Sequence, residues 1–250
     1  MELAVLLGDM AVRSKSMVDS CIGIYACHGA AFYGGTIGNI IGSCFGEDYS
    51  CMSAAMTYGS IGDITESCMG YIACDDIGQV YGKVGNIVKS CLGESACDDA
   101  AEYFGVIGSI SGSCTTDHSC QFLGKYGGIV GSITNSCTSE YSCDNLATGV
   151  GKVGDVKDSC SAQWSCQKAG FNRGSLGSIT TSCNAEVACQ GAGSGTAGAV
   201  TSNLNGCCNA ASACESATQA TLPAQCKENS KVRKCDGFAP KLKQLSIPFY

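Results

Sequence analysis

Apolar residues recur along this chain every 23 residues, with a single interval of 24. Two aliphatic columns lie three positions apart in each repeat. The first comprises Ile37, Ile61, Val84, Ile107, Val130, Val153 and Leu176, and the second comprises Ile40, Ile64, Ile87, Ile110, Ile133, Val156 and Ile179. A third column, three residues after the second cysteine of each repeat, comprises Ala30, Ala54, Ile77, Ala100, Leu123, Leu146, Ala169 and Ala192. Because 23 residues are too few for two packed helices, the pattern predicts short stacked strands.

Glycine fills the position after each residue of the first aliphatic column, as Gly38, Gly62, Gly85, Gly108, Gly131, Gly154 and Gly177. An unbroken glycine column indicates a bend, or a backbone dihedral that other residues resist. We therefore predict an all-β fold: a right-handed parallel β-helix, or solenoid, of eight to nine coils with three short strands per coil. The repeats span residues 20–214. We expect a capping helix over residues 1–19 and an irregular, basic cap over residues 215–250.

Each repeat also carries two cysteines six residues apart, with one extra residue in the second repeat. Six extended residues would separate the two cysteines by about 20 Å, whereas a disulfide needs Cα atoms within roughly 4.4–6.8 Å, so bridging requires a corner. We interpret the pairs as disulfides within each coil. The expected pairs are Cys21–Cys27, Cys44–Cys51, Cys68–Cys74, Cys91–Cys97, Cys114–Cys120, Cys137–Cys143, Cys160–Cys166, Cys183–Cys189 and Cys208–Cys214, with Cys226–Cys235 in the cap. The alternatives are two ladders of free buried thiols, bridges between coils, or metal binding; Cys207 is left over.

The repeat S-C-x-G-x-x-A-C with G-x-I-G-x-I, seen in "SCMGYIAC", "SCLGESAC" and "GSITNSC", resembles the cysteine-rich β-helix proteins of diatoms and other stramenopile algae. The resemblance covers residues 20 to about 214. It implies the same fold and an algal secretory setting, and it implies no particular activity.

Composition narrows the cellular setting and the partners. The 21 cysteines predict a secreted, extracellular or cell-wall location, because disulfides persist in oxidising compartments. A net charge of −7 argues against a nucleic-acid partner, and the apolar runs are too short for a membrane span. Six of the chain's cationic side chains lie in residues 221–250 against two acidic ones. We expect an extracellular polysaccharide or matrix protein as the partner, and self-association end to end or side by side.

Two groups of residues are candidate sites. The carboxylates Asp75, Asp76, Asp98 and Asp99 form pairs on adjacent coils, where they could bridge Ca²⁺ or simply form a solvated turn. No other cofactor is expected. His118, Tyr141 and Trp164 lie on successive coils, two residues before the second cysteine, and could stack against sugar rings or against one another.

Three functions follow as hypotheses. The first is a structural or interaction module that binds carbohydrate. The second is an ice-binding protein, since the columns beside the second aliphatic column contain hydroxyls, including the stretches "SIT" at 132–134 and 178–180. The third is a polysaccharide lyase or hydrolase built on the aspartates; the few cations of the repeats make an enzyme the weaker expectation.

Overall fold

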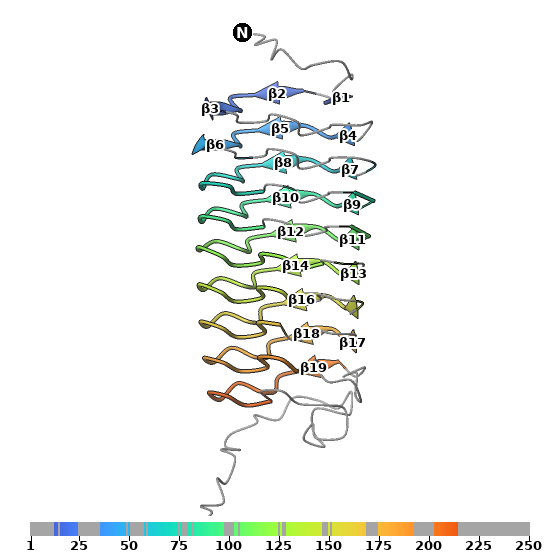
Figure 1. The fold of residues 1–250 in the computed structure, drawn as a ribbon, viewed down its shortest axis with the longest axis vertical. Coiled ribbons are helices and arrows are strands. Elements are labelled where there is room, and N and C mark those ends of the chain that lie inside the picture. The colour runs from blue at the N-terminus through green and yellow to red at the C-terminus, as the bar shows by residue number, and fades with distance from the viewer. Residues whose placement is uncertain are drawn as a thin grey trace, which may run out of the picture.

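The computed structural model shows a stack of short parallel strands that forms a solenoid (Figure 1). It describes residues 13–14, 16–24, 36–48, 50, 58, 60–74, 76, 80–81, 83–97, 103–104, 106–124, 126, 129–146, 150, 152–168, 175–192 and 203–214. Among these residues there is no α-helix. The predicted all-β parallel solenoid is therefore confirmed.

Two long sheets form two sides of the solenoid. Sheet A has eight parallel strands: β1 (Arg13–Ser14), β4 (Thr36–Ile37), β7 (Ser60–Ile61), β9 (Lys83–Val84), β11 (Val106–Ile107), β13 (Ile129–Val130), β15 (Lys152–Val153) and β17 (Ser175–Leu176). Sheet B has nine: β2 (Met17–Val18), β5 (Ile40–Ile41), β8 (Ile64–Thr65), β10 (Ile87–Val88), β12 (Ile110–Ser111), β14 (Ile133–Thr134), β16 (Val156–Lys157), β18 (Ile179–Thr180) and β19 (Leu204–Asn205). Each strand pairs with its counterpart in the next coil, so equivalent residues lie side by side.

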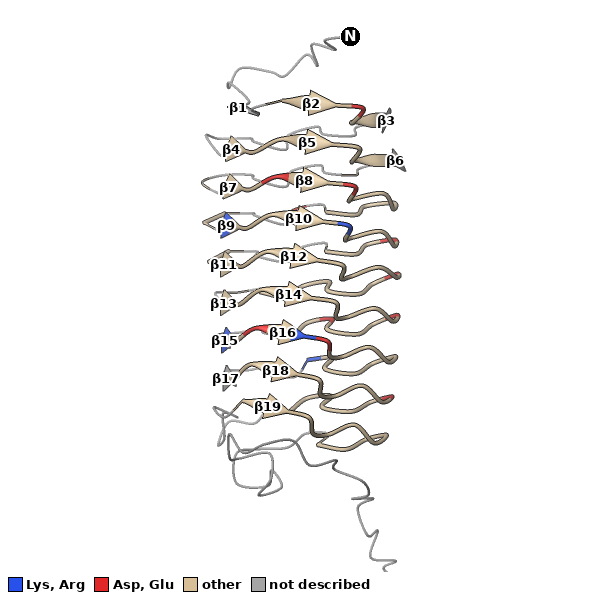
Figure 2. Cartoon of the chain, turned by 180° about the vertical axis from the view of Figure 1, so that it is seen from behind, with Lys and Arg blue, Asp and Glu red and all other residues tan. Residues whose placement is uncertain are grey.

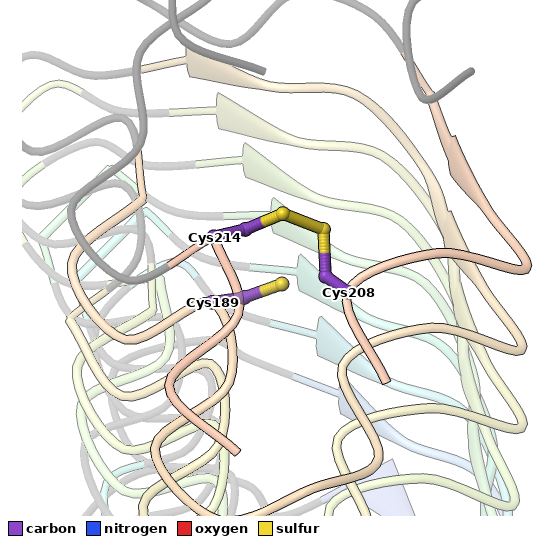
Figure 3. Close-up of side chains that lie close together, drawn as sticks. All are labelled: Cys189, Cys208 and Cys214. Carbon is purple, nitrogen blue, oxygen red and sulfur yellow. A yellow bond between two sulfur atoms is a disulfide. The ribbon is translucent and has the colours of Figure 1, made fainter. Parts of the chain in front are cut away.

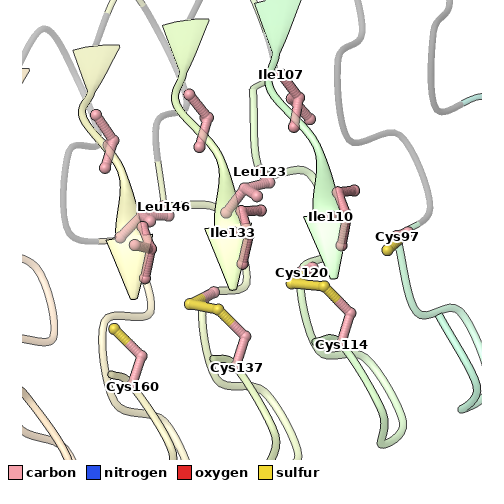
Figure 4. Close-up of a cluster of buried hydrophobic side chains, with 14 of the residues drawn as sticks. Cys97, Ile107, Ile110, Cys114, Cys120, Leu123, Ile133, Cys137, Leu146 and Cys160 are labelled. Carbon is pink, nitrogen blue, oxygen red and sulfur yellow. A yellow bond between two sulfur atoms is a disulfide. The ribbon is translucent and has the colours of Figure 1, made fainter. Parts of the chain in front are cut away.

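The three aliphatic columns form the core (Figure 4). Every member of the first two columns is buried, with at most 4% of its surface exposed, and Leu204 extends the second column into the last described coil. In the third column Leu123, Leu146 and Ala192 are buried, and the other members lie outside the described residues. Each buried aliphatic side chain contributes about 1.5–3 kcal/mol relative to an exposed one.

The third side of the coil differs from the prediction of a third strand. Among the described residues of that side, only β3 (Ile22–Ile24) and β6 (Phe45–Asp48) form a strand pair, and the later described corners, such as residues 114–120, are turns. The backbone is the cause, because Cys114, His118 and Cys120 have φ of 54°, 53° and 64°. Left-handed residues at three of seven positions cannot continue an extended strand.

The N-terminal segment also differs from the prediction. Residues 13–14 and 17–18 are the strands β1 and β2, paired with β4 and β5, rather than part of a helix over residues 1–19. Arg13–Ser14 and Met17–Val18 occupy the same repeat positions as Thr36–Ile37 and Ile40–Ile41, so the repeat begins before residue 20. Residues 1–12 and the predicted cap at 215–250 lie outside the described residues.

A ladder of buried serines runs beside the cysteines. From Ser43 to Ser182, the serine before the first cysteine has no exposed surface: Ser43, Ser67, Ser90, Ser113, Ser136, Ser159 and Ser182. In a typical coil Ser136 Oγ donates to the carbonyl of Thr134 at 2.8 Å and accepts the N–H of Ser159 at 3.1 Å. The ladder thus gives one buried backbone donor per coil a partner, which burial requires.

The glycine column has a different cause from the one expected. Gly38, Gly62, Gly85, Gly108, Gly131 and Gly154 do not have left-handed φ values. A Cβ on Gly131 would instead lie 2.3 Å from Oδ1 of Asp155 and 2.7 Å from its backbone N, in the next coil. Glycine is therefore required by close contact between coils.

Candidate interaction surfaces

Disulfides pin the corner of each described coil. Seven of the expected pairs are bonded, from Cys68–Cys74 to Cys208–Cys214, with Cα atoms 5.4–5.7 Å apart. Cys21 and Cys44 are also disulfide-bonded, while their expected partners Cys27 and Cys51, like Cys226 and Cys235, lie outside the described residues. Cys207 is buried and is not part of a disulfide. The interpretation of these seven pairs as free thiols is therefore wrong.

The sulfur atoms of neighbouring coils lie close together. Sγ of Cys189, Cys208 and Cys214 all lie within 4.8 Å of one another (Figure 3). These atoms belong to the disulfides Cys183–Cys189 and Cys208–Cys214, and a metal ligand must be a thiolate. The sulfur column is therefore a covalent brace and does not have the donor chemistry of a metal site.

His118, Tyr141 and Trp164 are brought together as the sequence predicted. His118 and Tyr141 stack with ring centroids 5.0 Å apart and planes 5° apart, and Trp164 lies 6.5 Å from Tyr141 at a tilt of 34°. Neighbouring rings therefore cover one another's faces, and a bound sugar would need an uncovered ring face for stacking. Trp164, which is 39% exposed, is the most accessible of the three.

Two further aromatic ladders lie along sheet A, and sequence reasoning missed them. Tyr58, Tyr81 and Phe104 stack at 5.5 and 5.3 Å, and Tyr103 stacks on Tyr126 at 5.1 Å. All five rings are exposed. The available signal was the 23-residue recurrence of aromatic residues shortly before the first aliphatic column.

Of the four candidate Ca²⁺ ligands, only Asp76 is described, and it is half-buried; Asp75, Asp98 and Asp99 lie outside the described residues. A different acidic column is present, at the tips of the corners. We call Glu94, Asp117, Glu140 and Glu186 the acidic ridge; all four are exposed. Figure 2 shows acidic turns along one edge of the rod. The spacing of these residues, three after each first cysteine, was visible in the sequence.

The polar column beside the second aliphatic column is bonded to the backbone of the neighbouring coil. Asp63 Oδ1 accepts the N–H of Asn39 at 2.7 Å, and Asp155 Oδ1 accepts the N–H of Ser132 at 2.8 Å. Asn86, Ser109, Ser178 and Asn203 accept backbone N–H groups in the same way. These side chains are positioned to cap the backbone, so they do not offer the free hydroxyl array that ice binding would use.

The pKa of Asp144 departs clearly from its ordinary value. Burial raises its pKa from 3.8 to about 6, opposed by hydrogen bonds from Gln167 and Asn145 and by the nearby Lys168 and His118. Gln167 Nε2 donates to Asp144 at 3.2 Å, and Gln190 Nε2 donates to Gln167 at 2.8 Å. Asp144 is therefore part of a side-chain ladder that links three coils.

No protein-family model, curated protein or solved structure matches this chain. Among the described residues, no helix is long and apolar enough to cross a membrane. Conclusions about function therefore depend on the surfaces described above.

Proposed function

We propose that this chain is a structural and interaction module of an extracellular surface or matrix: a stiff, right-handed rod of eight to nine coils. The observation that carries the proposal is the continuous bracing of the coils. Each coil from residue 68 onward has a corner disulfide, and the serine ladder links each coil to the next. Bonding of this kind stabilises an extended shape and demands an oxidising compartment.

The distribution of polar groups also favours a structural role. The buried serines and Asp144 are hydrogen-bonded to neighbours, and only Thr116 Oγ1 is a buried side-chain polar atom without a partner among the described residues. An enzyme site gathers titratable groups with shifted pKa values around a substrate. Here the described carboxylates of the acidic ridge are exposed and spread along the rod.

Expression of the same chain in an oxidising secretory pathway and in a reducing cytosol tests this role. We expect the secreted chain to be lighter by two protons per disulfide, to resist proteolysis, and to scatter X-rays as a rod. We expect the cytosolic chain to be degraded readily, because the disulfides that close its small corner loops do not form there. A reduced chain that forms an equally resistant rod would overturn the proposal.

Carbohydrate binding is a second candidate, and the exposure of Trp164 favours it. Since Trp164 tilts 34° from Tyr141, it is the ring of this stack with the least covered face. Binding to immobilised glycans should then be lost on Trp164→Ala and kept on Tyr126→Ala, an exposed aromatic in a separate ladder. Equal binding by both variants and the parent would exclude this site.

A further inference from the structure

The outer face of sheet A combines apolar and cationic side chains. Lys83, Val106, Ile129 and Lys152 lie side by side on β9, β11, β13 and β15, and we call them the sheet A face. Val106 and Ile129 are 39% and 40% exposed, and both lysines are exposed without an ion pair among the described residues. The exposed Tyr103, Phe104 and Tyr126 lie close by in sequence. Apolar and aromatic area with charge at its ends is typical of an interaction surface.

The acidic ridge lies on the opposite edge of the rod. Figure 2 shows the basic strands β9 and β15 along one edge and the acidic turns along the other. Lys83 and Lys152 are three coils apart, because β11 and β13 lie between their strands. Asp117 and Glu186 are likewise three coils apart. At about 4.8 Å per coil, both pairs span roughly 14 Å.

We propose that the sheet A face of one copy binds the acidic ridge of a second copy, so that rods associate side by side. Since both surfaces have the spacing of the same coil, Lys83 and Lys152 meet Asp117 and Glu186 of the second copy together, whichever way the second rod runs. From residue 68 onward, other three-coil steps along this column place a neutral residue opposite one lysine, as Gln163 is for Glu94. Within these coils, this register is therefore the one that pairs both cations.

The centre of the contact is consistent with this register. Val106 and Ile129 then face Glu140 and Gln163 of the second copy, which already bond to each other at 3.3 Å. Trp164, next to Gln163 in the chain, adds exposed apolar area there. Because the two surfaces differ and lie on opposite edges, the contact does not close and the rods form an open row.

This inference rests on the proposed structural role, and charge reversal tests it separately. One double variant, Lys83→Glu with Lys152→Glu, makes the sheet A face acidic; a second, Asp117→Lys with Glu186→Lys, makes the ridge basic. Sedimentation equilibrium should show that the parent associates and that each variant alone does so at least about tenfold more weakly, because like charges then meet. An equimolar mixture should regain association, since each variant carries a surface complementary to the other. Association of the parent should weaken with added salt.

Two controls keep the result interpretable. Lys89→Glu with Lys157→Glu makes the same change in net charge away from the sheet A face and should leave association unchanged. Asp117→Asn with Glu186→Gln should weaken association without introducing like charges. A monomeric parent, an unaffected variant, or a mixture that fails to associate would overturn the proposal. Loss of association only on reversal of the lysines would overturn it too, because the lysines would then contact a surface of the second copy other than the acidic ridge. All variants should remain protease-resistant rods, so failure here is distinct from failure of the structural role.

Discussion

Removal of one corner disulfide should lower the stability of the rod by a measurable and specific amount. In Cys137→Ala with Cys143→Ala, a loop closed by residues six apart is opened, which costs about 2 kcal/mol on the chain-entropy model. Both cysteines are fully buried, so the lost sulfur volume adds about 1–2 kcal/mol. The total of about 3–4 kcal/mol is a large share of the roughly 5–15 kcal/mol that stabilises a typical domain.

The backbone supplies a sharper test of the same pair. Cys137 and Cys143 have φ of 54° and 60°, a conformation that costs a residue with a Cβ about 1–2 kcal/mol and glycine little. Glycine loses about 0.5–1 kcal/mol more than alanine in chain entropy on folding, which offsets part of this gain. We therefore expect Cys137→Gly with Cys143→Gly to be about 1 kcal/mol more stable than the alanine pair, the reverse of the usual order.

Urea unfolding followed by far-ultraviolet circular dichroism measures these differences. Hydrogen exchange should accompany it, because a solenoid can open locally around the altered coil. An alanine pair within about 0.5 kcal/mol of the parent would refute the loop-closure contribution. A glycine pair less stable than the alanine pair would show that the left-handed corner is not strained.

Three other predictions follow from single residues. Asp144 has a folded-state pKa above its ordinary value, so its protonated form stabilises the fold. This stabilisation is fully present below pH ~4, and up to about 3 kcal/mol of it is lost as the pH rises through ~6. Asp144→Asn should abolish this loss in thermal melts across that pH range. A pH-independent parent would contradict it. Gly131→Ala should destabilise the rod by at least about 1–3 kcal/mol, because its Cβ would strike the backbone of Asp155; an unchanged melting temperature would refute the close-contact explanation. Thr181→Gly should raise stability by about 1 kcal/mol in urea titrations. The reason is that Thr181 is β-branched, has φ 47° and occupies the repeat position held by Gly112 and Gly206 in other coils. The control Thr180→Gly, in β18, should lower stability.

The sequence predicted the features that depend on period alone. Columns of equivalent residues, the parallel solenoid and the corner disulfides all follow from a strict 23-residue repeat, because stacking places equal positions side by side. The mutual stacking of His118 and Tyr141 was foreseen for the same reason. The helix over residues 1–19 was wrong where residues are described, since a degenerate half-repeat such as residues 13–18 carries too few of the repeat letters to be recognised.

Features that depend on contacts between coils were harder to predict. Serine precedes each first cysteine from Ser20 to Ser182, yet a small polar residue next to a cysteine gives no indication of whether its hydroxyl is buried. The glycine column and the polar column that follows it are coupled across coils, as Gly131 and Asp155 show, and this coupling is invisible within one repeat. The left-handed corners carry residues as varied as His118 and Trp164, so no glycine marks them.

The coupling between coils explains which positions of the repeat can vary and therefore where function can reside. The column that includes Asp63, Asn86 and Ser109 varies in side chain, but six of its members supply an oxygen that accepts a backbone N–H of the preceding coil. The outer positions of sheets A and B and the corner tips carry no such bond to the backbone in most described coils, so lysine, valine, tyrosine and glutamate can all occur there without loss of the fold. Chemical differences along the rod are consequently confined to its outer columns. Charged side chains in one outer column are separated by multiples of the coil spacing, so a second rod with the same spacing can bind in register with them.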